Sequence, residues 1–273
     1  MQSKELLMSQ ECNHDCSNCE SKCDNELPRY QMNEHSSVKK TYAIVSGKGG
    51  VGKSSLTALL ASSLARQGYQ VGVLDADITG PSIPKAFGID EKATGSETEI
   101  NPAITASGIK VMSINLLLEN NSDPVVWRGP VITGIVQQFY ENVAWGKLDY
   151  LLIDMPPGTG DVPLTVFQSI PIDGIVIVTS PQELVGMIVE KAVKMAKMMH
   201  IPVKGIVENY SFFTCPDNGK NYQIFGESHI DAIASEYDID VLAKLPIDPQ
   251  LAKLVDAGEV ERYDVPALDD VLK

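Results

Sequence analysis

Residues 47–54 read GKGGVGKS, and they constrain the fold more than any other part of the chain. They satisfy the pattern G-x-x-x-x-G-K-[ST], in which glycines let backbone N–H groups converge on phosphate oxygens. The pattern needs a buried strand before it and a helix after it, and the sequence offers an apolar run at 41–46 and a helical pattern at 55–68. The stretch therefore predicts a phosphate-binding loop that opens a helix.

Short apolar runs alternate with longer helical patterns after this loop. The runs lie at 70–75, 149–154, 174–180, 203–209 and 238–246. Strands that are apolar on both faces are typical of a parallel sheet covered by helices. We expect an α/β fold of the P-loop NTPase type, with a doubly wound, mainly parallel sheet and helices on both faces. The stretch 88–108 lacks such a run and should be an exposed excursion.

The first 38 residues differ in composition from the rest, because they are rich in Cys, Asn, Glu and Ser and have little apolar periodicity. We expect a cysteine-rich, cluster- or metal-binding extension at 1–38. The remaining residues, 39–273, should form one P-loop domain, since a chain of 273 residues with 44% hydrophobic content can bury a single large core.

The charge and hydropathy of the chain limit its partners and its location. A formal net charge of −14 repels polyanions, so nucleic acids and anionic membranes are unfavourable partners. No apolar run reaches the roughly 18 residues of a membrane span, and the amino terminus lacks the apolar stretch of a secretory signal. We therefore expect a cytoplasmic protein with neither a nucleic-acid nor a membrane partner.

Four of the five cysteines, Cys12, Cys16, Cys19 and Cys23, have the spacing C-x₃-C-x₂-C-x₃-C. In a reducing cytosol such thiols serve metal or redox chemistry more often than disulfides. Four thiolates this close together can surround one compact centre, as in iron–sulfur ligand runs, whereas zinc ribbons separate two C-x₂-C pairs by a longer loop. A 4Fe-4S cluster is therefore favoured over zinc, which stays open as the alternative.

Polar side chains of the loop and of two strand ends should meet at the phosphates. Lys53 would neutralise the β and γ phosphates, and the Ser54 hydroxyl would bind Mg²⁺. Asp75 and Asp77 end one predicted strand and Asp154 ends another, so all three should project toward the same edge. For Asp75, a capping or buried structural carboxylate is an equally good interpretation.

Lys48 is not needed to hold phosphate in its own loop, so its presence needs another reason. Because of this extra lysine, the loop resembles the deviant phosphate loop, K-G-G-x-G-K-[ST], of the MinD/ParA-like dimerising ATPases. The stretches DADITGPSIP, WRGP, DMPPGTGD and VENYSFFTCP are similar to Mrp/ApbC-type iron–sulfur cluster carrier ATPases across nearly all of residues 39–257. The resemblance implies a Mg²⁺-dependent ATPase that acts as a nucleotide-dependent homodimer, with apo iron–sulfur proteins as its clients.

The resemblance also implies residue roles. Lys48 would reach the nucleotide of the partner subunit, as an arginine finger does in trans, while Asp77 would position the attacking water and Asp154 would orient Mg²⁺ through water. Catalysis would thus rest on Lys48, Lys53 and Asp77. The expected cofactor-binding residues are Gly47, Lys48, Gly49, Gly50, Val51, Gly52, Lys53, Ser54, Ser55, Asp154, Gly158, Asn209, Pro246 and Asp248.

Within that set, Gly158 would sense the γ-phosphate through its backbone, and Asn209, Pro246 and Asp248 would contact adenine. Asn209 is also compatible with a plain turn residue.

The sequence departs from the family pattern at one position. Such carriers usually have a C-x-x-C pair after the adenine asparagine, but this chain keeps Cys215 and has Asn218. Two subunits would offer two thiolates rather than four, so Cys215 is either a partial cluster ligand or a small buried hydrophobe. Two other functions stay open: a redox ATPase that delivers electrons from an amino-terminal cluster, and a nucleotide-switched scaffold with structural zinc.

Overall fold

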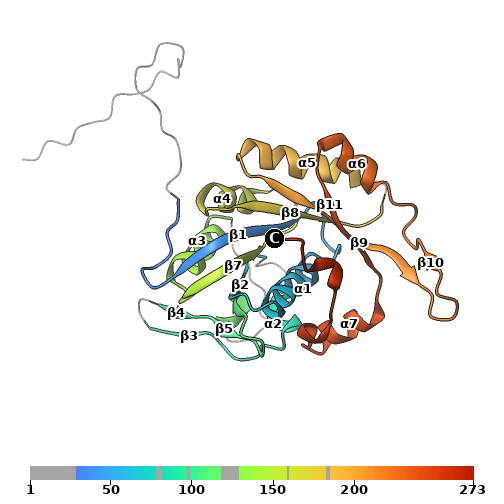
Figure 1. Ribbon diagram of the computed structural model, residues 1–273. Coiled ribbons are helices and arrows are strands. Elements are labelled where there is room, and N and C mark those ends of the chain that lie inside the picture. The colour runs from blue at the N-terminus through green and yellow to red at the C-terminus, as the bar shows by residue number, and fades with distance from the viewer. Residues whose placement is uncertain (1–28, 78–81, 97–98, 118–128, 159, 183–184) are drawn as a thin grey trace, which may run out of the picture.

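The computed structural model describes residues 29–77, 82–96, 99–117, 129–158, 160–182 and 185–273 (Figure 1). Among these residues the strands are β1 (Ser37–Ser46), β2 (Val71–Asp75), β3 (Thr94–Gly95), β4 (Ile100–Asn101), β5 (Ala103–Ile104), β6 (Lys110–Met112), β7 (Lys147–Asp154), β8 (Gly174–Thr179), β9 (Val203–Thr214), β10 (Asn221–Tyr222) and β11 (Val241–Pro246). The helices are α1 (Lys53–Arg66), α2 (Ile83–Ala86), α3 (Gly129–Asn142), α4 (Asp161–Ser169), α5 (Val185–Met198), α6 (Ile230–Tyr237) and α7 (Pro249–Asp256), with 3-10 turns at Ile114–Leu116, Val260–Arg262 and Pro266–Leu268.

Within the described residues, nine strands form one sheet in the order β10–β9–β8–β1–β7–β2–β6–β5, and β11 also pairs with β9. All its pairs are parallel except those that β5 and β10 make at its margins. The chain first builds outward from β1 to β2 and β6, then returns through β7 and continues on the other side of β1. This topology confirms the predicted doubly wound, mainly parallel α/β fold and places the glycine-rich loop at the centre of the sheet.

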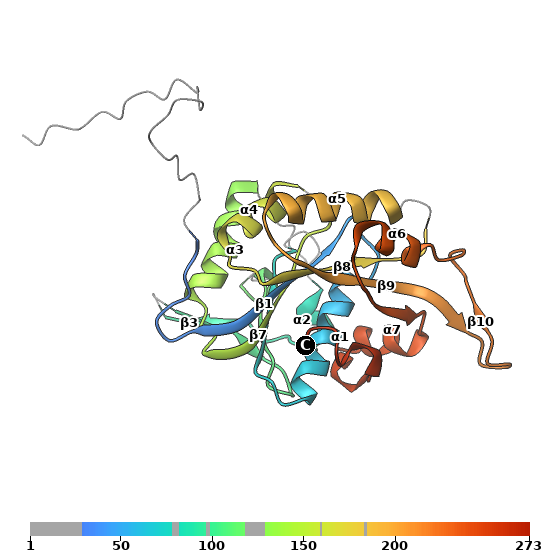
Figure 2. The same cartoon turned by 45° about the horizontal axis from the view of Figure 1, so that its top comes forward.

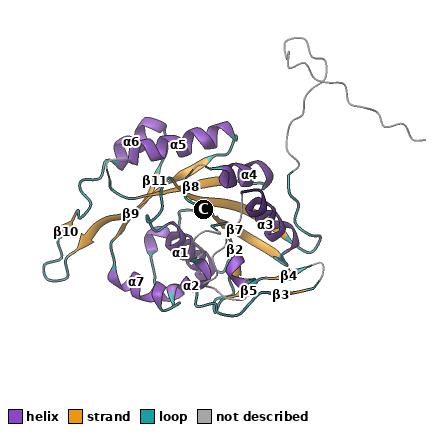
Figure 3. Cartoon of the chain, turned by 180° about the vertical axis from the view of Figure 1, so that it is seen from behind, coloured by secondary structure: helices purple, strands orange, loops and turns teal. Residues whose placement is uncertain are grey.

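Helices cover both faces of the sheet, as Figures 2 and 3 show. Along β1 the side chains of Ala43 and Val45 pack toward α3, α4, α5 and α6, whereas Tyr42 and Ile44 pack toward α1 and α2 on the opposite face. Alternate burial in two cores is the reason why these strands read as continuous apolar runs. Buried strands of this kind position the loops at their carboxyl ends rigidly.

The described chain enters the fold at the amino end of β1. The Tyr30 backbone N–H donates to the Ser169 carbonyl at the end of α4, 2.6 Å away, and that of Asn33 donates to the Glu141 carbonyl at 3.0 Å. β1 then begins at Ser37, earlier than the apolar pattern predicts, because three of its first four residues are polar and exposed. The glycine-rich loop follows the opposite, carboxyl end of the same strand.

The expected excursion at 88–108 contains short strands that the sequence pattern did not predict. β3 and β4 form a separate antiparallel pair, and β5 adds to the central sheet beside β6. Each has only two residues, which is too short for an alternating hydrophobic pattern to be recognised.

Candidate nucleotide-binding site

The loop between β1 and α1 has a backbone that only glycine adopts easily. Gly50 and Gly52 have φ of 80° and 79°, in the left-handed region. A Cβ on Gly52 would also lie 2.2 Å from the Asn209 Nδ2 atom, and one on Gly47 would lie 2.2 Å from Ile188 Cγ2 of α5. The glycines therefore serve both the turn and the close packing of the loop against β9 and α5.

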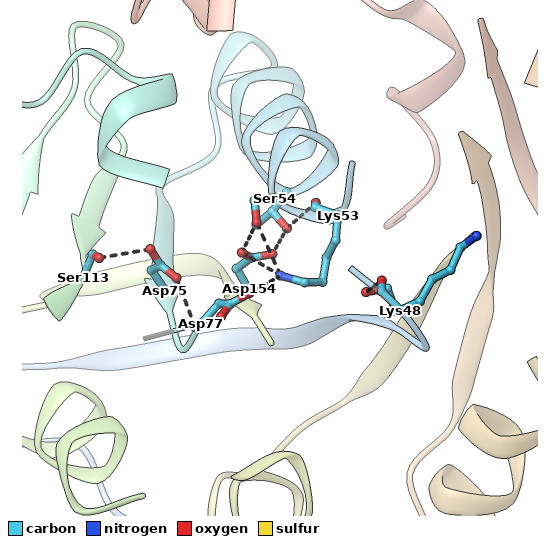
Figure 4. A network of polar contacts seen from close by, with 9 residues as sticks. Lys48, Lys53, Ser54, Asp75, Asp77, Ser113 and Asp154 are labelled. Carbon is cyan, nitrogen blue, oxygen red and sulfur yellow. Dashed lines mark hydrogen bonds and ion pairs between the residues drawn. The ribbon is translucent and has the colours of Figure 1, made fainter. Parts of the chain in front are cut away.

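Lys53, the first residue of α1, has a buried ammonium group between two carboxylates. Its Nζ lies 2.9 Å from Asp154 Oδ2 and 3.7 Å from Asp77 Oδ2, and the side chain is only 6% exposed (Figure 4). A cation removed from water must be paired, so Asp154 holds this lysine at the mouth of the loop.

Asp154 also accepts hydrogen bonds from two hydroxyl groups of α1. The Ser54 hydroxyl donates to Oδ2 at 2.5 Å, and the Thr57 hydroxyl donates to Oδ1 at 2.8 Å. Sequence reasoning missed Thr57, although its place one turn after Lys53 on the same helix face is the signal that could have found it. The three contacts fix a fully buried carboxylate beside the loop.

Asp75, the last residue of β2, and Asp77, two residues further on, have different environments. Asp75 is buried and accepts hydrogen bonds from the Asp77 backbone N–H at 3.1 Å and from the Ser113 hydroxyl at 3.0 Å. Burial raises the pKa of the Asp75 carboxyl well above its usual range, and the neighbouring Asp154 raises it further. These contacts fit the interpretation of Asp75 as a buried structural carboxylate. Asp77 instead lines the cavity in front of the loop.

Substituting Asp75 with Asn should stabilise the nucleotide-free protein at neutral pH. A carboxyl whose pKa is raised by folding contributes full stability below its unfolded pKa near 3.8, and this contribution is lost as the pH rises through the folded pKa. The amide does not titrate, and it can accept from the Asp77 N–H while donating to Ser113. Urea unfolding should show that the advantage of Asp75→Asn grows as the pH rises above about 4. A constant difference would contradict the raised pKa.

A cavity of about 240 Å³ opens in front of the loop, between it, Asp77 and Pro157. Figure 4 shows the Lys48 side chain directed away from Lys53 and Asp154, and in the described part of the chain no carboxylate lies within salt-bridge distance of it. Gly158 has φ of 91°, and its N–H donates to the Ser46 carbonyl at 2.8 Å. The backbone N–H of Gly158, the expected γ-phosphate sensor, is thus bonded to the last residue of β1.

A second cavity, of about 310 Å³, lies beside the first, and Ser55 borders both. It contains the predicted adenine contacts Asn209, Pro246 and Asp248. The Asn209 amide donates to the Val51 carbonyl at 3.0 Å, which ties β9 to the phosphate loop.

Asp248 has a further role that the sequence did not indicate. Its carboxylate caps α7 by accepting from the Gln250 N–H at 2.7 Å, and it also accepts from the Tyr263 hydroxyl. The side chain of Asp248, a residue that lines the cavity, is thus engaged by the protein on both oxygens.

Of the five cysteines expected as cluster ligands, the described residues contain only Cys215. Cys12, Cys16, Cys19 and Cys23 lie outside them. Cys215 is half-buried in the β9–β10 turn, where Asn218 accepts from the Lys220 N–H at 2.9 Å and donates to the Tyr222 hydroxyl at 3.2 Å. The amide that replaces the family's second cysteine therefore stabilises this turn. Over the described ranges, no group of three or more His, Cys, Asp or Glu side chains could hold a metal ion.

A glycine-rich loop of this shape, at the carboxyl edge of a doubly wound sheet, makes the chain a P-loop NTPase by fold. The cell division ATPase MinD of Pyrococcus furiosus shares the fold, with a TM-score of 0.60 at 19% identity over 85% of this chain and 95% of that one. A family model described as ParA, NUBPL iron-transfer P-loop NTPase, matches residues 37–269. The chain belongs to this family, which confirms the resemblance seen in its motifs.

Two more similar proteins support the assignment. The iron-sulfur cluster carrier protein of Clostridium perfringens is 44% identical over 249 residues, which cover 88% of this chain and 87% of that one. A nucleotide-binding protein of Archaeoglobus fulgidus, solved in complex with ADP, has a TM-score of 0.78 and 46% identity, over 86% of this chain and 93% of that one. In the described residues, no helix combines the length and apolar character needed to cross a membrane.

Proposed function

We propose that this protein binds and hydrolyses ATP with Mg²⁺ and, as a nucleotide-dependent homodimer, carries 4Fe-4S clusters to apo iron–sulfur proteins. One observation carries the proposal: Lys53 is held by Asp154 inside the phosphate loop, while the loop's other lysine, Lys48, is directed away from this cluster. This arrangement supports a division of roles in which Lys53 would bind the subunit's own phosphates and Lys48 would reach those of a second subunit.

The phosphate site supplies the charges that a triphosphate needs. The glycine-rich loop and the amino end of α1 line the cavity, where their backbone N–H groups would bind phosphate oxygens. Lys53 would exchange the Asp154 carboxylate for phosphate oxygens as its partner. The Ser54 hydroxyl and the Asp154 carboxylate are hard oxygen donors, which suit Mg²⁺ as direct and water-mediated ligands respectively. Bound there, Mg²⁺ would neutralise charge on the β and γ phosphates.

Hydrolysis needs a group that orients water, and Asp77 is the candidate. Its carboxylate lies on the wall of the phosphate cavity and 3.7 Å from Lys53 Nζ. There it would accept a hydrogen bond from the attacking water and take up its proton. Lys48 from the second subunit would stabilise the charge that develops on the transferring phosphoryl group, so turnover would depend on dimer closure.

The neighbouring cavity suits adenine. Asn209 uses one amide hydrogen for Val51 and its oxygen accepts from the Tyr210 N–H, which leaves one hydrogen and one lone pair for the edge of a base. The Pro246 segment would form a wall of the cavity, and Asp248 would contribute its backbone at the rim.

The cargo assignment rests on the family and on the cysteine spacing. Cys12, Cys16, Cys19 and Cys23 would hold the cluster, and Cys215 would contribute at most a single thiolate because Asn218 is occupied in its own turn.

Cluster transfer from anaerobically purified protein tests this proposal. The protein, loaded with iron and sulfide, should restore the activity of an apoprotein that needs a 4Fe-4S cluster, and it should release phosphate from ATP only when Mg²⁺ is present. Lys53→Ala is the matched control and should lose nucleotide binding. Metal analysis that finds zinc instead of iron would contradict the carrier function and support the zinc scaffold. Electron delivery without cluster loss would support the redox ATPase.

A further inference from the structure

Tyr210 lies in an irregularity of β9 that joins the nucleotide cavities to the β9–β10 hairpin. Lys244 of β11 pairs with Glu208, and Pro246 pairs with Phe212. Between these two pairs β9 therefore advances by four residues, whereas β11 advances by two. The extra residues form a bulge, and Tyr210 within it has φ of 60°. A bulky residue in the left-handed region is strained and persists only when its surroundings hold it. Bulges redirect side chains, often beside active sites.

Hydrogen bonds of the residues around Tyr210 hold the bulge. The Asn209 amide donates to the Val51 carbonyl of the phosphate loop. The Glu208 carboxylate, only 1% exposed, accepts from the Ser211 hydroxyl at 2.6 Å and from the Ser228 hydroxyl at 2.8 Å. Since Ser228 follows the hairpin excursion in the chain, the same strand segment is fixed to the loop and to the base of the hairpin.

The Tyr210 side chain spans the distance between these two regions. It borders the base cavity, and a Cβ on Gly52 would lie 3.0 Å from its hydroxyl oxygen. Its ring also contacts that of Phe225, with centroids 6.2 Å apart. Phe225 belongs to a group of exposed apolar side chains with Tyr222 and Ile224, beside the hairpin that extends from the body of the domain in all three ribbon views.

We propose that Tyr210 is a positioning residue that transmits the occupancy of the base cavity to the hairpin bearing Cys215. The inference rests on the proposed function in that the ligand is an adenine nucleotide. A base in the cavity would pack against the Tyr210 ring and restrict it, and the ring would in turn order Phe225 and residues 213–226. A ligand shifts such an equilibrium because it contacts one arrangement better than the other. Nucleotide binding would thereby control the exposure of the Cys215 thiol.

Hydrogen exchange of the full-length protein with and without saturating Mg-ADP tests the proposal. Mg-ADP should slow exchange in residues 213–226 by at least about fivefold, the lower end of typical coupling between sites. Tyr210→Phe should keep this response, because the ring remains, and Tyr210→Ala should lose it. Phe225→Ser removes the second ring without touching the cavity, so it should bind Mg-ADP normally and also lose the response. Peptides covering residues 103–112, at the far margin of the sheet, provide the internal control.

Alkylation of Cys215, located by peptide mass spectrometry, gives a second readout. Nucleotide should slow it in the wild type and in Tyr210→Phe, but not in Tyr210→Ala or Phe225→Ser. Calorimetric measurement of Mg-ADP binding distinguishes a failure of the role of Tyr210 from a failure of the proposed nucleotide binding. Binding without any change at residues 213–226, or a wild-type response in both Tyr210→Ala and Phe225→Ser, would overturn the role of Tyr210 alone. Absence of Mg-ADP binding to the wild type would overturn the proposed function and this inference with it.

Discussion

Replacing Lys48 with alanine should lower ATP turnover by about 10³-fold, the range seen for charge supplied in trans to phosphoryl transfer. ATP binding should largely survive, since Lys53, Ser54 and the loop backbone remain in place. The physical reason is that Lys48 makes no contact with the subunit's own Lys53–Asp154 cluster and would meet developing charge only across a closed dimer. Steady-state phosphate release and equilibrium nucleotide binding measure the two effects separately.

Mixed dimers provide the decisive control for Lys48. Lys48→Ala and Asp77→Asn should each be nearly inactive alone, but a mixture should regain part of the turnover. In a mixed dimer, the site with an intact Asp77 receives Lys48 from the other subunit. A lysine that acted within its own subunit would give no recovery. Unchanged turnover of Lys48→Ala would eliminate the role of Lys48 altogether.

Changing both Cys16 and Cys19 to serine should remove most of the iron bound by anaerobically purified protein. Two remaining thiolates cannot hold a 4Fe-4S cluster against solvent and chelators. Cys215→Ser should change the iron content little, because its neighbour Asn218 is engaged in the turn and an amide is a poor ligand for iron beside thiolate sulfur. Iron analysis and electron paramagnetic resonance of the variants measure this difference.

The reverse outcome would indicate a different location for the cluster. If iron persisted without Cys16 and Cys19 but disappeared in Cys215→Ser, the cluster would lie at the seam between two subunits, where closure by ATP would act on it directly. The nucleotide-binding variant Lys53→Ala is the matched control, since it should keep its iron.

The features that depend on local sequence could be predicted. The glycine spacing predicted the phosphate loop, and continuous apolar runs predicted the buried parallel strands, because both patterns record constraints within a few residues. Asp154 was placed correctly beside Lys53 since the carboxyl ends of parallel strands meet at one edge.

The features that depend on partners distant in the sequence could not be predicted. Asp75 and Asp77 both lie at the carboxyl end of β2, but the Ser113 hydroxyl that binds the buried Asp75 carboxylate comes from 38 residues away. No local pattern shows that Asp75 has this partner while Asp77 lines the cavity. Tyr210 likewise gains its position from an irregular register between β9 and β11, which no local pattern encodes.

The entry of the chain at the amino end of β1 sets how far the cysteine quartet can reach. Cys23 precedes Arg29, the first described residue, by six residues, which can span at most about 20 Å. The ten residues of β1 span about 33 Å between Ser37 and the phosphate loop. If the quartet holds the cluster near the amino end of β1, the cluster would lie at the opposite edge of the sheet from its own subunit's nucleotide. A dimer that closes over ATP at one pole would leave its cargo accessible at the other, and an acceptor could dock there without separating the subunits.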